Sequence, residues 1–250
     1  MRFEALDSLR GVAALGVAYG HFYGPQFMGG ARHFAFYLLV DLFFVLSGFV
    51  LAHRYLDEWL TGRVTLSRTA LLAVACLLAI FTGAHSLDVH VQNALPWVNF
   101  GILRCLAETA VGVLVYRCYR ALDDKIEVGR AVATLVEFAL LIAIGSLLLR
   151  KPFTSPEDVL IVPLFAVLVF WLASPRGALG MLLSTRPFTF VGRMSYSIYI
   201  NHFLVVIALS LSIFKPWWLY FGLVLGLSWI TWRWIETPAR AAINQRLAIV

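Results

Sequence analysis

The segment Leu6–His21, LDSLRGVAALGVAYGH, decides the fold: an apolar run follows an acid and a base and ends at a histidine. An α-helix advances about 100° per residue, so the eleven steps from Arg10 to His21 turn about 1100°. The two side chains therefore share nearly one face, about 16 Å apart along the axis. Spacings of three and four residues continue this stripe through Asp7, Arg10, Ala14, Val17, His21 and Gly24.

The composition is that of a membrane protein. Of the 250 residues, 61% are hydrophobic and 14% are charged, whereas a soluble domain is about half apolar and a quarter charged. The formal net charge is +6, but the basic residues lie in short loops between apolar segments, so no nucleic-acid partner is expected. The three cysteines form no C-x-x-C pair, so neither a disulfide framework nor a zinc site is predicted.

Eight apolar segments are long enough, or nearly so, to cross about 30 Å of hydrocarbon. Only helices satisfy their own backbone hydrogen bonds in lipid, so we expect an all-α polytopic integral membrane protein. Acidic residues precede the first apolar run, which favours a retained helix over a cleaved leader. The last two segments should form a tight helical hairpin. The predicted spans are 9–26, 36–54, 69–84, 96–116, 131–149, 158–174, 195–214 and 216–234.

The distribution of Lys and Arg predicts the orientation of this bundle. With the N-terminus in the cytoplasm, 15 of these side chains fall in inside regions and 4 in outside loops. Because cytoplasmic loops carry the excess of basic residues, both termini are predicted to be cytoplasmic. Arg10 then lies near the cytoplasmic boundary and His21 near the middle of the membrane.

Two interpretations of the first helix remain open. Arg10 can be a boundary anchor and His21 a hydrogen-bonded packing residue. Alternatively, both face a bundle interior or a wet cavity, as ionisable groups at membrane depth usually do. A neutral histidine there can act as a general base.

Other polar residues interrupt the apolar segments. In VDLFFVLSGF, Asp41 and Gly48 share a face, and Ser47 beside them can hydrogen-bond across helices. In MSYSIYINH, Ser195, Tyr199 and His202 fall on one side of a helix, and His202 is placed to join a polar network with the first helix.

The sequence also contains possible ion pairs, a possible helix N-cap and possible metal ligands. Glu236 is spaced to pair with Arg233 or Arg240, either as a surface ion pair or as a cytoplasm-facing carboxylate that orients a basic partner. The Thr-Pro sequence after it predicts that Thr237 caps a new helix. Arg104 and Glu108 are spaced to neutralise each other. No metal site is predicted, since the spacing of the candidate ligands fits no usual motif; these are His85, Asp88 and His90.

The motifs LDSLRGVAALGVAYGH, DLFFVLSGF, GRMSYSIYINH and IETPAR occur in this order, and together they resemble the acyltransferase 3 family of membrane enzymes that O-acylate glycans and surface polymers. The resemblance covers the first two and last two helices, and the stretch GILRCLAETAVGVLVYRCYR also resembles that family's Arg-led helix. It implies cytoplasmic acyl-CoA as co-substrate, with no permanently bound cofactor, and a glycan or polysaccharide acceptor.

The resemblance also implies site residues. Arg10 and His21 match the family's Arg and His signature, so Arg10 would hold donor phosphates or the site geometry and His21 would be the base or a transient acyl carrier. A pantetheine arm could lie along the stripe between them. The expected substrate-binding residues are Asp7, Asp41, Ser47, Tyr199, His202 and Glu236.

The chain is predicted to be a single acyltransferase 3-like domain, 1–250, that lacks part of the family's central region. We expect a multi-pass protein of the cell inner (plasma) membrane that transfers an acyl group, expected to be acetyl, to a hydroxyl. The alternative is an inactive relative that binds or transports an acylated or lipid-linked glycan. An ion-coupled transporter is a weaker alternative, since no inverted repeat is evident.

Overall fold

The structure is a computed structural model that describes residues 3–23, 35–56, 100–149, 160–210, 212 and 215–247. Within these ranges every regular element is a helix, as the sequence predicts. The elements in chain order are α1 (Glu4–Tyr23), the 3₁₀ turn η1 (Phe36–Leu38), α2 (Leu39–Leu51), the π-helical turn η2 (Ala52–Leu56), α6 (Phe100–Leu122), the 3₁₀ turn η3 (Asp123–Lys125), α7 (Arg130–Leu148), α8 (Ile161–Ala173), α9 (Ala178–Leu183), α10 (Arg186–Arg193), α11 (Ser195–Ser210), α12 (Trp217–Thr231), the π-helical turn η5 (Trp232–Glu236) and α13 (Thr237–Leu247).

Most predicted apolar segments coincide with these helices. The segment 36–54 becomes η1, α2 and part of η2, while 131–149 and 158–174 become α7 and α8. The last two segments become α11 and α12, which pack on each other as the predicted hairpin requires. The segment 69–84 lies outside the described residues. The helices α9 and α10 were not predicted, because they are too short to show as membrane-crossing segments.

Two described helical stretches are long and apolar enough to cross a membrane, Phe36–Arg54 and Arg130–Leu148. The pair α10 and α11 makes a third if its 63° bend is counted within one span. The helix α8 is apolar but shorter. The protein therefore has membrane-crossing helices by length and composition, while the full set of eight crossings stays a prediction.

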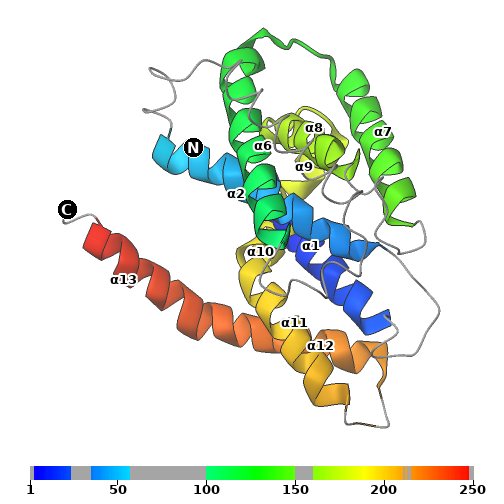
Figure 1. Cartoon of the computed structure of the whole chain (residues 1–250), viewed down its shortest axis with the longest axis vertical. Coiled ribbons are helices and arrows are strands. Elements are labelled where there is room, and N and C mark those ends of the chain that lie inside the picture. The colour runs from blue at the N-terminus through cyan, green and yellow to red at the C-terminus, as the bar shows by residue number, and fades with distance from the viewer. Residues whose placement is uncertain are drawn as a thin grey trace.

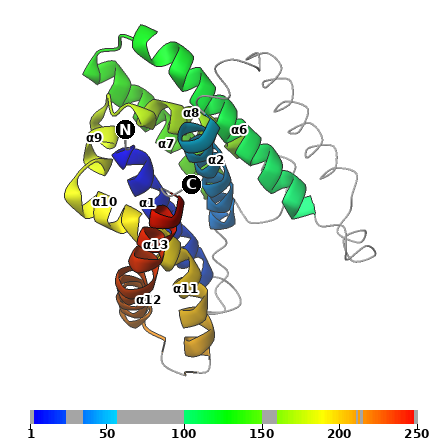
Figure 2. The same ribbon diagram turned by 90° about the vertical axis from the view of Figure 1, so that its left-hand side faces the viewer.

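The first helix lies at the centre of the packing. Its residues contribute to both hydrophobic clusters of the described chain, one shared with α2, α6, α7 and α8 and the other shared with α11 and α12. Figure 2 shows α1 between α2 on one side and α10 to α12 on the other. By contrast, α13 extends away from the bundle (Figure 1). Most faces of α1 are thus packed, which fixes the positions of its polar residues.

The helices α1 and α11 run in the same direction. Arg10, near the start of α1, meets Ser195 at the start of α11, and His21, near the end of α1, meets His202 farther along α11. The two parallel helices therefore bring one polar pair together at each end of the predicted stripe.

The helix α12 runs in the opposite direction. Phe22 near the end of α1 stacks on Tyr220 near the start of α12, with ring centroids 4.8 Å apart. At the other end, Ser197 of α11 meets Glu236, which follows α12. The chain therefore returns along α1 and α11 before it enters α13.

The helices α2 and α6 also run in the same direction. Asp41 meets Arg104 near the starts of these helices, and Phe49 meets Tyr116 farther along both. Because the intervening residues 57–99 include one predicted crossing, this parallel arrangement is the one that alternating crossings require.

Glycines allow two pairs of helices to touch at the backbone. A Cβ atom at Gly11 of α1 would lie 2.7 Å from the nitrogen of Gly192 in α10, and one at Gly192 would collide with the carbonyl of Asp7. Likewise, a Cβ atom at Gly112 of α6 would lie 2.9 Å from the Cα atom of Gly48 in α2 and collide with the carbonyl of Val45. Small residues at such crossings let helix backbones approach closely.

Gly112→Ala is therefore expected to destabilise the protein by about 1–3 kcal/mol, because the added methyl must push two backbones apart. The matched control is Gly145→Ala in α7, where nothing lies within 4 Å of the added Cβ and helix propensity favours alanine. Thermal unfolding in detergent solution measures both changes. Equal melting temperatures for the two variants would contradict the close packing of α2 and α6.

Candidate functional site

At the start of α1, an arginine joins two helices. The Arg10 Nη2 group donates a hydrogen bond to Asp7 Oδ1 at 3.0 Å, and Arg10 Nε donates to Ser195 Oγ at 3.0 Å. Asp7 lies in the first turn of its helix, where a negative charge is favoured by the helix dipole. The side chains of Arg10 and Asp7 are 30% and 22% exposed, so this pair is accessible as well as ordered.

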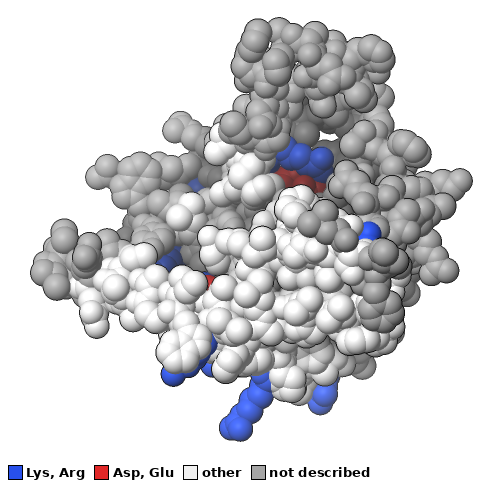
Figure 3. Space-filling view, turned by 90° about the horizontal axis from the view of Figure 1, so that it is seen from below, with Lys and Arg blue, Asp and Glu red and all other residues white. Residues whose placement is uncertain are grey.

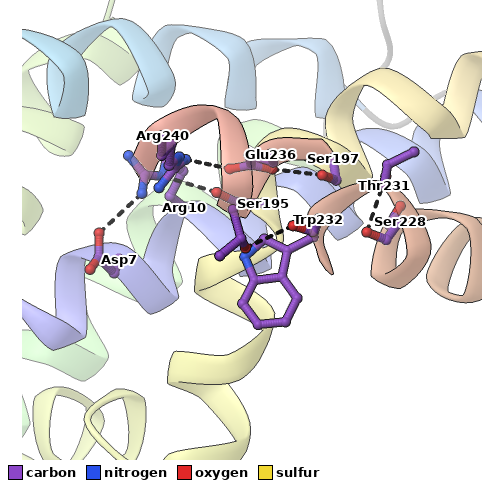
Figure 4. A network of polar contacts seen from close by, with 10 residues as sticks. Asp7, Arg10, Ser195, Ser197, Ser228, Thr231, Trp232, Glu236 and Arg240 are labelled. Atoms are coloured by element: carbon purple, nitrogen blue, oxygen red, sulfur yellow. Dashed lines mark hydrogen bonds and ion pairs between the residues drawn. The ribbon is translucent and has the colours of Figure 1, made fainter. Parts of the chain in front are cut away.

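A second polar link joins α11 to the end of the chain. Ser197 Oγ donates to Glu236 Oε2 at 2.6 Å, and Arg240 forms an ion pair with the other carboxylate oxygen. The Glu236 side chain is only 9% exposed. Of the two predicted basic partners, the structure pairs Glu236 with Arg240, while Arg233 is exposed. Figure 4 shows both links together, with Glu236 between Arg240 and Ser197.

The prediction that Thr237 caps a new helix is wrong. Thr237 has helical backbone angles, and its hydroxyl donates to the Trp232 carbonyl at 2.8 Å. The π-helical turn η5 carries α12 into α13 without a break, so the Thr-Pro sequence lies inside continuous helix. Such turns are frequent at functional sites.

Neighbouring polar residues strengthen this link and were not predicted as site residues. Asn201 Nδ2 donates to Thr231 Oγ1 at 2.8 Å, and the Thr231 hydroxyl donates to Leu227 O at 3.0 Å. The signal was present in the sequence: Ser197 and Asn201 are four residues apart in SYSIYIN and so share a helix face.

At the other end of α1, His21 lies against His202, with ring centroids 5.0 Å apart. His202 thus contacts the first helix through its ring, while the predicted polar network between them stays a prediction. Tyr199 lies beside His202 at 5.6 Å between ring centroids. His202 is buried, whereas His21 and Tyr199 are exposed.

The backbone determines the tautomer of His21. Its Nδ1 atom lies 3.0 Å from the carbonyl oxygen of Val17, and because a carbonyl can only accept, Nδ1 carries the proton in this bond. In the neutral ring, Nε2 then holds the lone pair. This is the form that a general base requires.

The middle of the predicted stripe is a packing surface and does not line a passage. Ala14 is 0% exposed and Val17 is 2% exposed. Ala14 packs in one cluster with Met194 and Ile198, from the start of α11 and the residue before it. A donor arm therefore does not lie along this face of α1 between Arg10 and His21, contrary to the expectation from the sequence.

Asp41 belongs to a fourth polar group. Arg104 forms ion pairs with Asp41 and with Glu108, the latter at 2.9 Å from Nε to Oε1. The two carboxylates are nearly fully buried, while the Arg104 side chain is 31% exposed. The predicted pair of Arg104 and Glu108 is confirmed, and the structure adds Asp41. Figure 3 views the molecule from the end where α11 leads into α12, and basic and acidic atoms lie together in a hollow there.

The remaining predicted residue of α2, Ser47, is exposed, while its neighbour Gly48 makes the contact with α6. Phe43, on the same helix as Asp41, reaches the histidine end, where its ring centroid lies 5.4 Å from that of Tyr199. The structure thus gathers the predicted residues into four groups, around Arg10, around Glu236, around His21 and around Arg104, and leaves Ser47 apart from them.

Glu137 of α7 is a buried carboxylate that was not predicted. It accepts hydrogen bonds from the backbone nitrogens of Leu179 at 2.8 Å and Gly180 at 3.1 Å, in the first turn of α9. An acid inside the apolar segment 131–149 was the available signal. Its two oxygens satisfy donors that the start of a helix leaves unpaired, so its role is structural. The candidate metal ligands His85, Asp88 and His90 lie outside the described residues.

The chain is similar to a known protein over part of its length. A stretch of 64 residues is 50% identical to "Protein 2 in picA locus" from Rhizobium radiobacter, covering 26% of this chain and 32% of that protein. The match thus spans about a third of that relative, whose name states no activity. No family model matches the chain, and no solved structure matches it. The resemblance to the acyltransferase 3 family therefore rests on the motifs.

Arg104→Met is expected to destabilise the protein by about 3 kcal/mol, because it leaves two buried carboxylates without their cation. Replacing all three residues, in Asp41→Asn, Arg104→Met, Glu108→Gln, should recover much of this loss, since no charge then remains unpaired. Unfolding of both variants in detergent measures the difference. A triple variant no more stable than the single one would show that the pairing contributes little.

Proposed function

We propose that this protein is a membrane acyltransferase that moves an acyl group, expected to be acetyl, from acyl-CoA to a hydroxyl of a glycan, a polysaccharide or a similar acceptor. One observation carries the proposal: α11 runs parallel to α1 and meets both ends of its polar stripe, with Ser195 at Arg10 and His202 at His21. Acyl transfer from a negatively charged donor uses a cationic site that binds the donor and a basic nitrogen at the reacting group, and Arg10 and His21 supply these two groups.

His21 is the proposed centre of the reaction. As a base, its Nε2 atom takes the proton from the acceptor hydroxyl, whose oxygen attacks the thioester carbonyl carbon. The carbon–sulfur bond then breaks, and the leaving thiolate takes the proton from the imidazolium. As an acyl carrier, Nε2 would itself attack the thioester carbonyl carbon, and the carbon–sulfur bond would break to release the thiolate. The acceptor hydroxyl would then attack the acyl-imidazole, its proton passing to the thiolate while the carbon–nitrogen bond breaks and restores His21. The bond from Nδ1 to Val17 supports both routes, because it leaves Nε2 for the reaction.

The remaining predicted residues take roles according to their position. Arg10, ordered by Asp7 and Ser195, binds the anionic part of the donor. Tyr199 and His202 line the histidine end, where acceptor and thioester meet. Because Ala14 and Val17 are buried, the donor reaches the exposed ring of His21 by a route other than the face of α1 that carries these two residues.

We further propose eight crossings of the cell inner membrane, with both termini in the cytoplasm. The excess of Lys and Arg in the inside regions supports this orientation. The directions of the helices also support it: α1 and α11 are parallel, α12 opposes them, and α2 is parallel to α6 across one intervening segment. Acyl-CoA would then bind from the cytoplasm at the Arg10 end.

A second candidate is an inactive relative that binds or transports an acylated or lipid-linked glycan. The burial of Ala14 and Val17 favours it, because no passage follows the stripe between the two polar ends. The exposure of His21 favours the enzyme, because a base must reach its substrate.

His21→Gln is expected to lower acyl transfer at least about 100-fold, since general base catalysis contributes a factor of this size or more. Labelled acetyl-CoA supplied to membranes that contain the protein, followed by label in glycans, measures the transfer. The matched control is His53→Asn, because His53 is also hydrogen-bonded, to Tyr116 Oη at 3.2 Å, but has no proposed role in transfer. Activity retained in His21→Gln would refute the assignment, and label on the wild-type protein without acceptor would identify the carrier route.

A further inference from the structure

We propose that Arg240 acts together with Arg10 as a two-guanidinium site for a diphosphate group. This inference rests on the proposed function, because it concerns the donor site at the Arg10 end. The two residues come from opposite ends of the chain, α1 and α13, and nothing in the sequence alone associates them. Figure 4 draws both residues in one network of polar contacts, with Arg10 bonded to Ser195 and Arg240 bonded to Glu236.

Both arginines are tied to the first turn of α11. Arg10 reaches it directly, through the hydrogen bond from Nε to Ser195 Oγ. Arg240 reaches it through Glu236, whose other oxygen accepts the hydrogen bond from Ser197. Ser195 and Ser197 both lie in the first turn of α11, so the two links end on the same turn of that helix.

Arg240 remains available to a ligand. Its side chain is 59% exposed, while the Glu236 side chain that pairs with it is 9% exposed. The acidic charge is therefore turned inward, toward Ser197, and the basic group outward. A guanidinium has five N–H donors in a planar fork, so Arg240 can keep its ion pair through Nη2 and still donate to an anion.

Two guanidinium groups together suit an anion with two adjacent charged groups. Arginine recognises phosphate by paired, charge-assisted hydrogen bonds, and two arginines linked to the same turn of α11 offer one guanidinium to each phosphate of a diphosphate. This chemistry can come from a nucleotide donor such as CoA or from a lipid-linked diphosphate. The first source belongs to the proposed enzyme and the second to the alternative glycan binder.

Binding to the purified full chain in a neutral detergent tests the proposal by isothermal titration calorimetry. The probes are inorganic pyrophosphate, CoA and farnesyl diphosphate. Arg240→Gln should weaken pyrophosphate binding about tenfold or more, the loss of one charge-assisted contact. Arg240→Lys, which keeps the charge but not the fork, should fall between wild type and Arg240→Gln. The matched control Arg233→Gln removes the same charge from the adjacent π-helical turn and should leave binding within about twofold.

Each outcome decides the proposal. Weaker binding of pyrophosphate and CoA in Arg240→Gln, with the control unchanged, supports both the site and the proposed function. The same loss for pyrophosphate and farnesyl diphosphate, with no binding of CoA by the wild type, supports the site and refutes acyl-CoA as donor. Equal losses in Arg240→Gln and Arg233→Gln, unchanged binding in Arg240→Gln, or no pyrophosphate binding by the wild type would overturn the site. Unchanged melting temperatures establish that the variants are folded.

Discussion

The backbone contact between Gly11 and Gly192 is the constraint on which the polar site depends. A Cβ atom on either residue would overlap the other helix, so α1 and α10 can cross this closely only with glycine in both places. Arg10 is next to the first glycine, and Ser195 follows the second by three residues. The crossing therefore fixes the position along α1 at which Arg10 contacts Ser195. Because α11 runs parallel to α1, His202 then lies beside His21.

Local patterns in the sequence predict local structure well. The apolar segments predict the ends of α7 to within one residue and those of α8 to within three, and the spacing of Arg104 and Glu108 predicts their pair. The same periodicity places Arg10 and His21 on one face of α1, because that argument needs only the helical repeat. These inferences succeed because each depends only on residues within one helix.

Contacts between distant residues could not be predicted in this way. Asp41 joins Arg104 across 63 positions, and Ser197 joins Glu236 across 39. Periodicity says which face carries a side chain but not which helix covers that face. For this reason the stripe through Ala14 and Val17 predicted a lining for a ligand, whereas packing against neighbouring helices covers it.

The π-helical turn η5 has a consequence for how the end of the chain is wound. Thr231 faces α11 and binds Asn201, and Glu236, five residues later, also faces α11 and binds Ser197. In an α-helix five residues turn through about 500°, which would aim Glu236 about 140° away from Thr231. The wider π winding, with bonds from i to i+5, returns it toward the same side. The π-helical turn thus offsets the rotation of the α-helix, so that two successive hydrogen bonds to α11, from Asn201 to Thr231 and from Ser197 to Glu236, form on the same side of the helix.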